Sequence, residues 1–148
     1  GIGPEVIVKA LTHQEVLSSA HIVVIGNYEA LTTAASKFLS TKLALEKTTS
    51  IYDLTTTSQV ISVLDLTEEQ QDIMPHYGRI SVQAAKASVA YILEAIKLAQ
   101  EGAINAIVTA PISKLAIQKA GFSYQGHTEI LASATGVKNY AMAFFHLK

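Results

Sequence analysis

The sequence predicts an α/β protein in which a mostly parallel sheet is flanked by helices. Three observations indicate this class. Hydrophobic residues make up 49% of the 148 residues and charged residues only 16%, which is typical of a domain with a largely buried sheet. Short apolar runs alternate with helical segments, and such β-α steps build parallel sheets. The apolar run at 106–108 is typical of a strand buried on both faces.

The N-terminal half contains the first β-α step. Residues 1–5 are predicted to form a loop that enters a helix, with proline and glutamate in its first turn. The run 21–26 (HIVVIG) indicates a strand, and 28–38 has the periodicity of an amphipathic helix. Shorter strands are expected near 43–45 and 60–64. Residues 68–74 are polar and are expected to be exposed.

The longest predicted helix spans about 80–101 and ends at Gly102. Its expected apolar stripe consists of Val82, Ala85, Val89, Leu93, Ile96 and Ala99. We expect this helix to pack against the sheet as scaffold. The strands at 23–25 and 106–108 should then lie parallel in one sheet, because β-α-β crossovers bury such runs. A final strand is expected at 140–145.

The stretch 104–131 is the one that predicts a functional site. The strand at 106–108 should stop at Pro111 and lead into a helix at 112–120 that ends at Gly121. After a turn, His127-Thr128-Glu129 leads into a second helical segment. The carboxyl end of an open α/β sheet is where ligands bind, and free helix N-termini favour anions.

Three polar side chains accompany these helix starts: Lys114, His127 and Thr128. An imidazole and a hydroxyl beside a helix N-terminus offer directed donors to a phosphate or carboxylate. Gly126 is expected to permit the turn that aims His127. The structural alternative is that Thr109 and Thr128 cap helices while His127 packs in a loop.

Two motifs carry a resemblance to a known family. The segment TAPISK…AG…YQGHTE resembles the 4-hydroxythreonine-4-phosphate dehydrogenase family of pyridoxal phosphate biosynthesis, including its sister group acting on threonate or erythronate 4-phosphate. The opening GIGPE is similar to the end of the family's GDPAGIGPE motif. The family protein is much longer, so the resemblance implies that 1–148 is a single or partial α/β domain of a two-domain chain. The implied architecture is that of the isocitrate and isopropylmalate dehydrogenases.

The resemblance also implies a chemistry. An NAD- or NADP-dependent enzyme that requires a divalent metal (Zn, Mg or Co) would oxidise and decarboxylate a 4-phosphorylated hydroxy acid such as 4-phosphooxy-threonine. His127 and Thr128 match the His-Thr pair of GHTE, which contacts the phosphorylated substrate in the family. Lys114, in PISK, either adds a cation to the same pocket or is an ordinary surface lysine. Catalytic and cofactor-binding residues stay unassigned.

The resemblance implies that histidines in motifs further along the family's chain hold the metal, so the metal ligands are expected outside this chain. The histidines form no local metal-ligand spacing; they are His13, His21, His76, His127 and His146. The chain alone should therefore be catalytically incomplete. A rival interpretation is a non-catalytic anion-binding module that uses the same loop, and the length of the reading frame would separate the two.

Composition limits the remaining classes. The formal net charge of −1 gives no reason to expect binding to nucleic acid or to a membrane, so the expected partner is a small phosphorylated substrate. The absence of cysteine excludes disulfides and thiolate metal sites and is compatible with a cytoplasmic enzyme. A homodimer is expected from the resemblance only.

Overall fold

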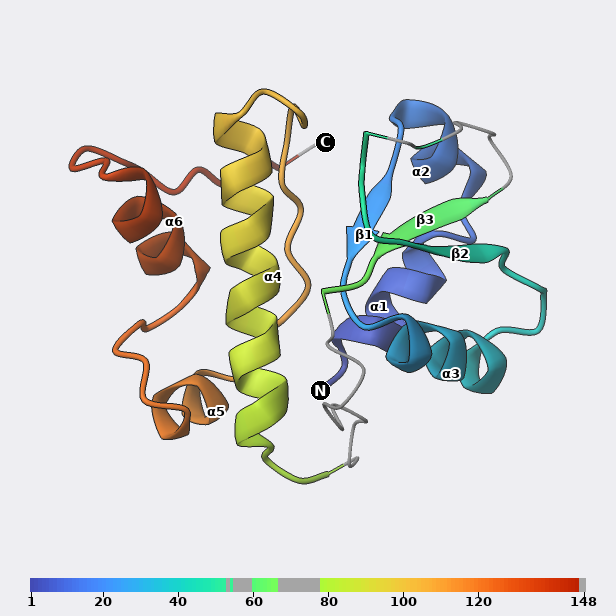
Figure 1. Cartoon of the computed structure of the whole chain (residues 1–148), viewed down its shortest axis with the longest axis horizontal. Helices are drawn as coiled ribbons and strands as arrows, with labels where there is room; N and C mark the ends of the chain where they lie inside the picture. The colour runs from blue at the N-terminus through green and yellow to red at the C-terminus, as the bar shows by residue number, and fades with distance from the viewer. Residues whose placement is uncertain (53, 55–59, 67–77, 147–148) are drawn as a thin grey trace.

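The computed structural model describes residues 1–52, 54, 60–66 and 78–146. The stretch 68–74, for which the sequence predicts exposure, lies outside the described residues. In chain order the elements are α1 (Gly3–Ala10), α2 (Gln14–Ser19), β1 (Val23–Ile25), α3 (Tyr28–Phe38), β2 (Leu45–Thr48), β3 (Ile61–Leu64), α4 (Val82–Gln100), α5 (Lys114–Lys119) and α6 (His127–Thr135). Figure 1 shows the sheet with α1–α3 on one side of α4, and α5 and α6 on its other side.

The described strands form a parallel three-stranded sheet in the order β1-β3-β2. Val24 pairs with Val63 on one side of β3, and Lys47 pairs with Val63 on the other. The strands expected near 21–26 and 60–64 are therefore confirmed, and the helix at 28–38 is confirmed over its whole length. The α/β class with a parallel sheet flanked by helices is correct.

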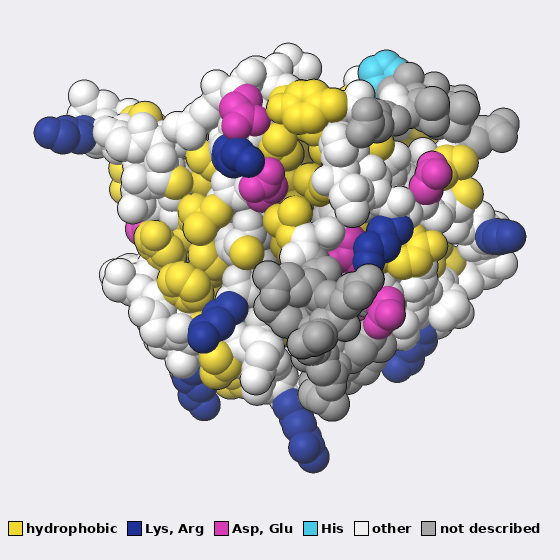
Figure 2. All heavy atoms as spheres, in the orientation of Figure 1, with side chains coloured by type: hydrophobic (Ala, Val, Ile, Leu, Met, Phe, Trp, Pro, Cys, Tyr) yellow, Lys and Arg dark blue, Asp and Glu magenta, His cyan; other side chains and the backbone are white. Residues whose placement is uncertain are grey.

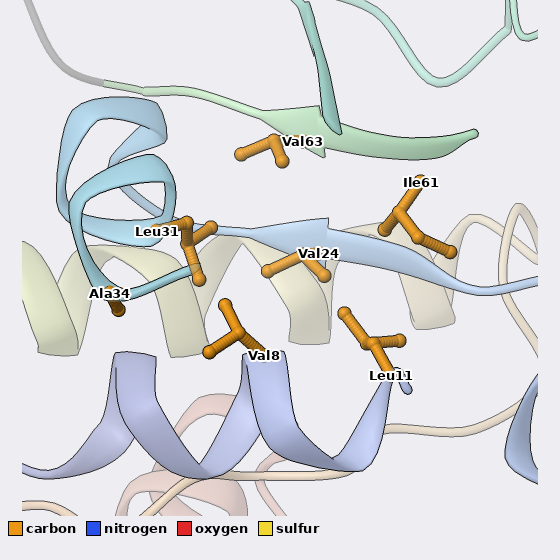
Figure 3. Close-up of a cluster of buried hydrophobic side chains, with 7 residues drawn as sticks. All are labelled: Val8, Leu11, Val24, Leu31, Ala34, Ile61 and Val63. Atoms are coloured by element: carbon orange, nitrogen blue, oxygen red, sulfur yellow. The ribbon is translucent and has the colours of Figure 1, made fainter. Parts of the chain in front are cut away.

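The first hydrophobic core lies between this sheet and the helices α1 and α3. Figure 3 shows its buried side chains converging from the two helices and from β1 and β3; they are Val8, Leu11, Val24, Leu31, Ala34, Ile61 and Val63. Val8 and Val63 are fully buried. Burying an aliphatic side chain of this size contributes about 1.5–3 kcal/mol, so this cluster is the main source of stability for the N-terminal half.

Helix α4 forms close to where it was expected. Ser81 caps it by accepting a hydrogen bond from the backbone N–H of Ala84 at 3.1 Å, and Gly102 follows its end with φ +74°. The predicted stripe is only partly correct, because Leu93 is 39% exposed while Ile92 is buried. Part of the buried face of α4 is turned toward α5 and α6, and α4 also contacts β1, as expected for a helix that packs against the sheet.

A second core joins α4 to α5 and α6. Its buried members are Ala85, Val89, Ile92, Ile96, Ala116, Ile117 and Ile130. Figure 2 shows that hydrophobic side chains also reach the surface over this half of the molecule, beside a group of acidic and basic side chains. None of the helices in the described part of the chain combines the length and the apolarity that a membrane span requires.

Two predicted strands are wrong. Residues 106–108 and 140–145 have no regular secondary structure, and Val108 is 97% exposed. A β-forming run becomes a strand only when a neighbouring strand accepts its ladder hydrogen bonds, and 106–108 has no such partner in the described structure. Packing holds the segment instead. Ile107 joins the second core, and the Cβ of Ala110 lies 3.5 Å from where a Cβ on Gly3 would be.

Candidate functional site

Helix α5 presents Lys114 as its first residue. The helix starts two residues later than predicted, because Ser113 is its N-cap and accepts a hydrogen bond from the backbone N–H of Ala116 at 3.3 Å. Thr109 and Pro111 therefore precede the helix and do not start it. Gly121 follows the helix with φ +91°, as predicted for a residue just past a helix end.

Helix α6 begins at His127 and has an N-terminus without a side-chain cap. Its N-cap is Gly126, and no side chain accepts a hydrogen bond there. Side chains cap α3, α4 and α5, whereas α1 and α2 resemble α6 in having no side-chain cap. Thr128 lies inside the first turn, so the alternative in which Thr128 caps the helix is wrong. The first N–H groups of α6 have no intrahelical partner and are free to meet an anion.

The imidazole of His127 is partly buried at this N-terminus. Its Nε2 is buried and has no hydrogen-bond partner in the described part of the chain. Leaving a buried polar atom unsatisfied costs about 1–3 kcal/mol, and histidines that serve packing are normally hydrogen-bonded. The orphaned nitrogen therefore favours an imidazole that receives its partner from outside the described residues.

Lys114 is exposed, and its side chain reaches the start of α6. A Cβ added to Gly126 would lie 3.9 Å from Cε of Lys114 and 3.4 Å from Oε2 of Glu129. With φ 176°, Gly126 is extended, a conformation open to any residue. Gly126 was expected to permit a turn that needs glycine. Instead, its lack of a side chain leaves space for Lys114 and Glu129.

Glu129 is the site residue that the sequence interpretation missed. The signal was present, because an acidic residue three positions after an N-cap is typical of the first turn of a helix. Lys114 and Glu129 thus both approach Gly126, the residue before His127.

Thr128 lies beside His127 in the first turn of α6. It lines a groove of about 330 Å³ between α6 and the segment that follows it; the other lining residues are Leu131, Ala132, Thr135, Val137, Tyr140, Ala141 and Met142. Neither His127 nor Lys114 lines this groove. The structure brings Lys114 to the α6 N-terminus, and Thr128 lies at that terminus and also borders the adjoining groove.

The position of this site relative to the sheet differs from the expectation. Helix α6 packs on α4, on the side away from the three strands (Figure 1). His127 is therefore not at the carboxyl edge of the β1-β3-β2 sheet. The expectation depended on a strand at 106–108 in that sheet, and this segment is not part of it.

The described residues do not fit a resident metal ion. They contain no group of three or more histidine, aspartate or glutamate side chains that could hold one. His146 lies in the exposed segment after α6, and the described residues around it complete no such group. The chemistry available at the α6 N-terminus is the recognition of an anion.

Comparisons with known proteins agree on one family. The sequence model of the family described as pyridoxal phosphate biosynthetic protein PdxA matches residues 18–148. A relative from Oceanobacillus iheyensis is 41% identical over 146 residues, which cover 96% of this chain and 42% of the relative. D-threonate 4-phosphate dehydrogenase from Salmonella typhimurium is 34% identical over 145 residues, which cover 98% of this chain and 44% of that protein.

The solved structures give the same result. The crystal structure of 4-hydroxythreonine-4-phosphate dehydrogenase from Klebsiella pneumoniae superposes with a TM-score of 0.85 at 33% identity, covering 99% of this chain and 44% of that one. The chain spans less than half the length of each of these proteins. Because the family's sequence model matches most of its residues, this chain belongs to the pyridoxal phosphate biosynthetic protein PdxA family.

Proposed function

We propose that this chain is the substrate-phosphate-binding part of an NAD(P)-dependent dehydrogenase of 4-phosphorylated hydroxy acids. The relatives support the reaction class, since they are named as dehydrogenases of 4-phosphorylated compounds. One structural observation carries the site assignment: the buried Nε2 of His127 has no partner in the described residues, beside a helix N-terminus that no side chain caps.

Each group at this N-terminus has a role that follows from its chemistry. The imidazole of His127 and the hydroxyl of Thr128 donate hydrogen bonds to phosphate oxygens, and the free N–H groups of α6 do the same. Lys114 adds a positive charge nearby. Charge-assisted hydrogen bonds of this kind contribute about 1.5–3 kcal/mol each. Together they would orient the substrate by its phosphate.

The remainder of the machinery belongs, in this proposal, to a longer two-domain polypeptide. In that longer protein, a bound nicotinamide cofactor would supply hydride-acceptor chemistry for the substrate alcohol and a divalent metal would supply Lewis-acid chemistry; no residue of this chain is assigned to hold either. The metal ligands and the cofactor site are proposed to lie outside this chain; in support, the described residues contain no group of three or more potential metal ligands. A cytoplasmic homodimer and decarboxylation of the oxidised product complete the proposal.

Two substrates compete within this class. The resemblance in the sequence motifs suggests 4-phosphooxy-threonine, and the Klebsiella structure carries the corresponding name. The names of sequence relatives favour D-threonate 4-phosphate instead. Both molecules carry the 4-phosphate that the α6 N-terminus would bind. Steady-state assays of the full-length protein with both compounds would rank them by kcat/KM.

The test of the site is His127→Ala in the full-length enzyme. Loss of one charge-assisted hydrogen bond should lower kcat/KM for the phosphorylated substrate by about tenfold to a few hundredfold, mainly through KM. Thermal stability should change little. His21→Ala is the matched control, because His21 is an exposed histidine before β1, and this variant should behave like the wild type.

A loss of stability without a loss of kcat/KM in His127→Ala would refute the assignment of His127 to the phosphate site. If His127→Ala melts much earlier yet keeps a near-normal kcat/KM when folded, the imidazole is a packing residue. If the full-length protein binds phosphorylated hydroxy acids but never reduces NAD or NADP, the non-catalytic anion-binding module is the correct interpretation.

A further inference from the structure

We propose that Glu129 is a built-in competitor of the substrate phosphate, which weakens phosphate binding at the N-terminus of α6. This inference rests on the proposed function, because it concerns the same phosphate site. It assigns a role to a carboxylate that the phosphate-binding scheme above does not use. Glu129 would act through Lys114 and through the helix terminus, and it is therefore a positioning residue.

The geometry places two charged side chains beside Gly126. Oε2 of Glu129 lies 3.4 Å from the point where a Cβ on Gly126 would be, and Cε of Lys114 lies 3.9 Å from the same point. The ammonium group of Lys114 is one bond beyond that Cε. The carboxylate of Glu129 therefore folds back over the first turn of its own helix, toward the lysine.

Lys114 and Glu129 lie near each other without forming an ion pair, and neither is engaged by another residue in the described part of the chain. The ion pairs found there join other residues, and Lys114 and Glu129 make no hydrogen bond in it. A carboxylate in the first turn of a helix is favoured by the free N–H groups there. Glu129 thus occupies the electrostatic position that an incoming phosphate would use.

A phosphate at this place has to overcome Glu129 in two ways. Its negative charge is repelled by the carboxylate, and the carboxylate attracts the same lysine and the same N–H groups. Among the described residues no group, Glu129 included, forms a hydrogen bond with Nε2 of His127, so this nitrogen is available to the anion. His127, Lys114 and the helix N-terminus then raise the affinity for phosphate, and Glu129 lowers it.

The experiment measures inhibition of the full-length enzyme by inorganic phosphate, competing with the phosphorylated substrate. Glu129→Gln keeps the shape of the side chain and removes its charge, so it should lower the phosphate Ki about two- to fivefold and lower KM with kcat unchanged. Lys114→Gln should raise Ki by a similar factor, and adding Glu129→Gln to it should bring Ki back toward the wild-type value. Glu15→Gln is the control, because Glu15 is an exposed acid in the first turn of α2.

A tighter Ki cannot result from a damaged fold, so the expected gain separates this role from a structural one. Unchanged or weaker phosphate inhibition in Glu129→Gln would overturn the inference. Measuring the phosphate Ki of His127→Ala as well shows whether the role of Glu129 alone is refuted or the proposed phosphate site with it. If His127→Ala raises Ki while Glu129→Gln leaves it unchanged, only the role of Glu129 is refuted. If phosphate does not compete with substrate and His127→Ala has no effect, both are refuted.

Discussion

Replacement of Asp65 by alanine should destabilise the N-terminal half more than any other single change of a charged side chain there. Asp65 directly follows β3, and its side chain is only 2% exposed. Its Oδ2 accepts a hydrogen bond from the backbone N–H of Tyr28 at 3.0 Å and lies 3.4 Å from Nζ of Lys47. One buried carboxylate thus joins the start of α3 to β2 and β3.

The magnitude follows from these two contacts. Losing a hydrogen bond to a charged acceptor costs about 1.5–3 kcal/mol, and the variant leaves the Tyr28 N–H without this acceptor. The ion pair contributes less, about 0–1 kcal/mol, because the side chain of Lys47 is half exposed and can be hydrated. We expect Asp65→Ala to lower the free energy of unfolding by about 2–4 kcal/mol.

Urea-induced unfolding of the full-length protein measures this change, and hydrogen exchange of the peptide containing Tyr28 localises it. Asp65→Asn keeps an acceptor oxygen and should lose only about 1–2 kcal/mol. Lys47→Gln should lose less than about 1 kcal/mol. The reasoning is refuted if Asp65→Ala unfolds within about 0.5 kcal/mol of the wild type, a range typical of surface substitutions.

Two further predictions concern the completeness of the chain and its second core. The purified 1–148 fragment should show no alcohol-dependent formation of NADH or NADPH, and metal-dependent turnover by it would contradict the placement of the metal and cofactor groups elsewhere. Ile117→Ala should lower the free energy of unfolding by about 2–5 kcal/mol, because Ile117 is 1% exposed in the core between α4 and α5. Leu115→Ala, on the same helix but 51% exposed, should change it little; equal losses in the two variants would show that α5 does not pack as described.

Local signals in the sequence were enough to predict most helices. The helix at 28–38 was predictable because its apolar periodicity and its boundaries are encoded within the segment, where Asn27 caps the start. Gly102 and Gly121 marked helix ends for the same local reason, and both have positive φ. In such places the residues that determine the structure are neighbours in the chain.

Tertiary relations were not predictable in this way. The run at 106–108 has the composition of a strand. It would form one only beside a strand whose backbone N–H and C=O groups are free to pair with it, and composition does not reveal such a neighbour. Asp65 was missed because its burial depends on β2, β3 and α3 together. The approach of Lys114 and Glu129 to Gly126 depends on how α5 and α6 pack on α4, although the GHTE motif itself was visible in the sequence.

The central claim is that the α6 N-terminus binds the substrate phosphate through His127. The most direct measurement is a crystal structure of the full-length protein with D-threonate 4-phosphate bound. The account predicts a phosphate oxygen within about 3.2 Å of a ring nitrogen of His127, with the Thr128 hydroxyl at a similar distance. A phosphate bound elsewhere, with Nε2 of His127 hydrogen-bonded to another part of the protein, would contradict it.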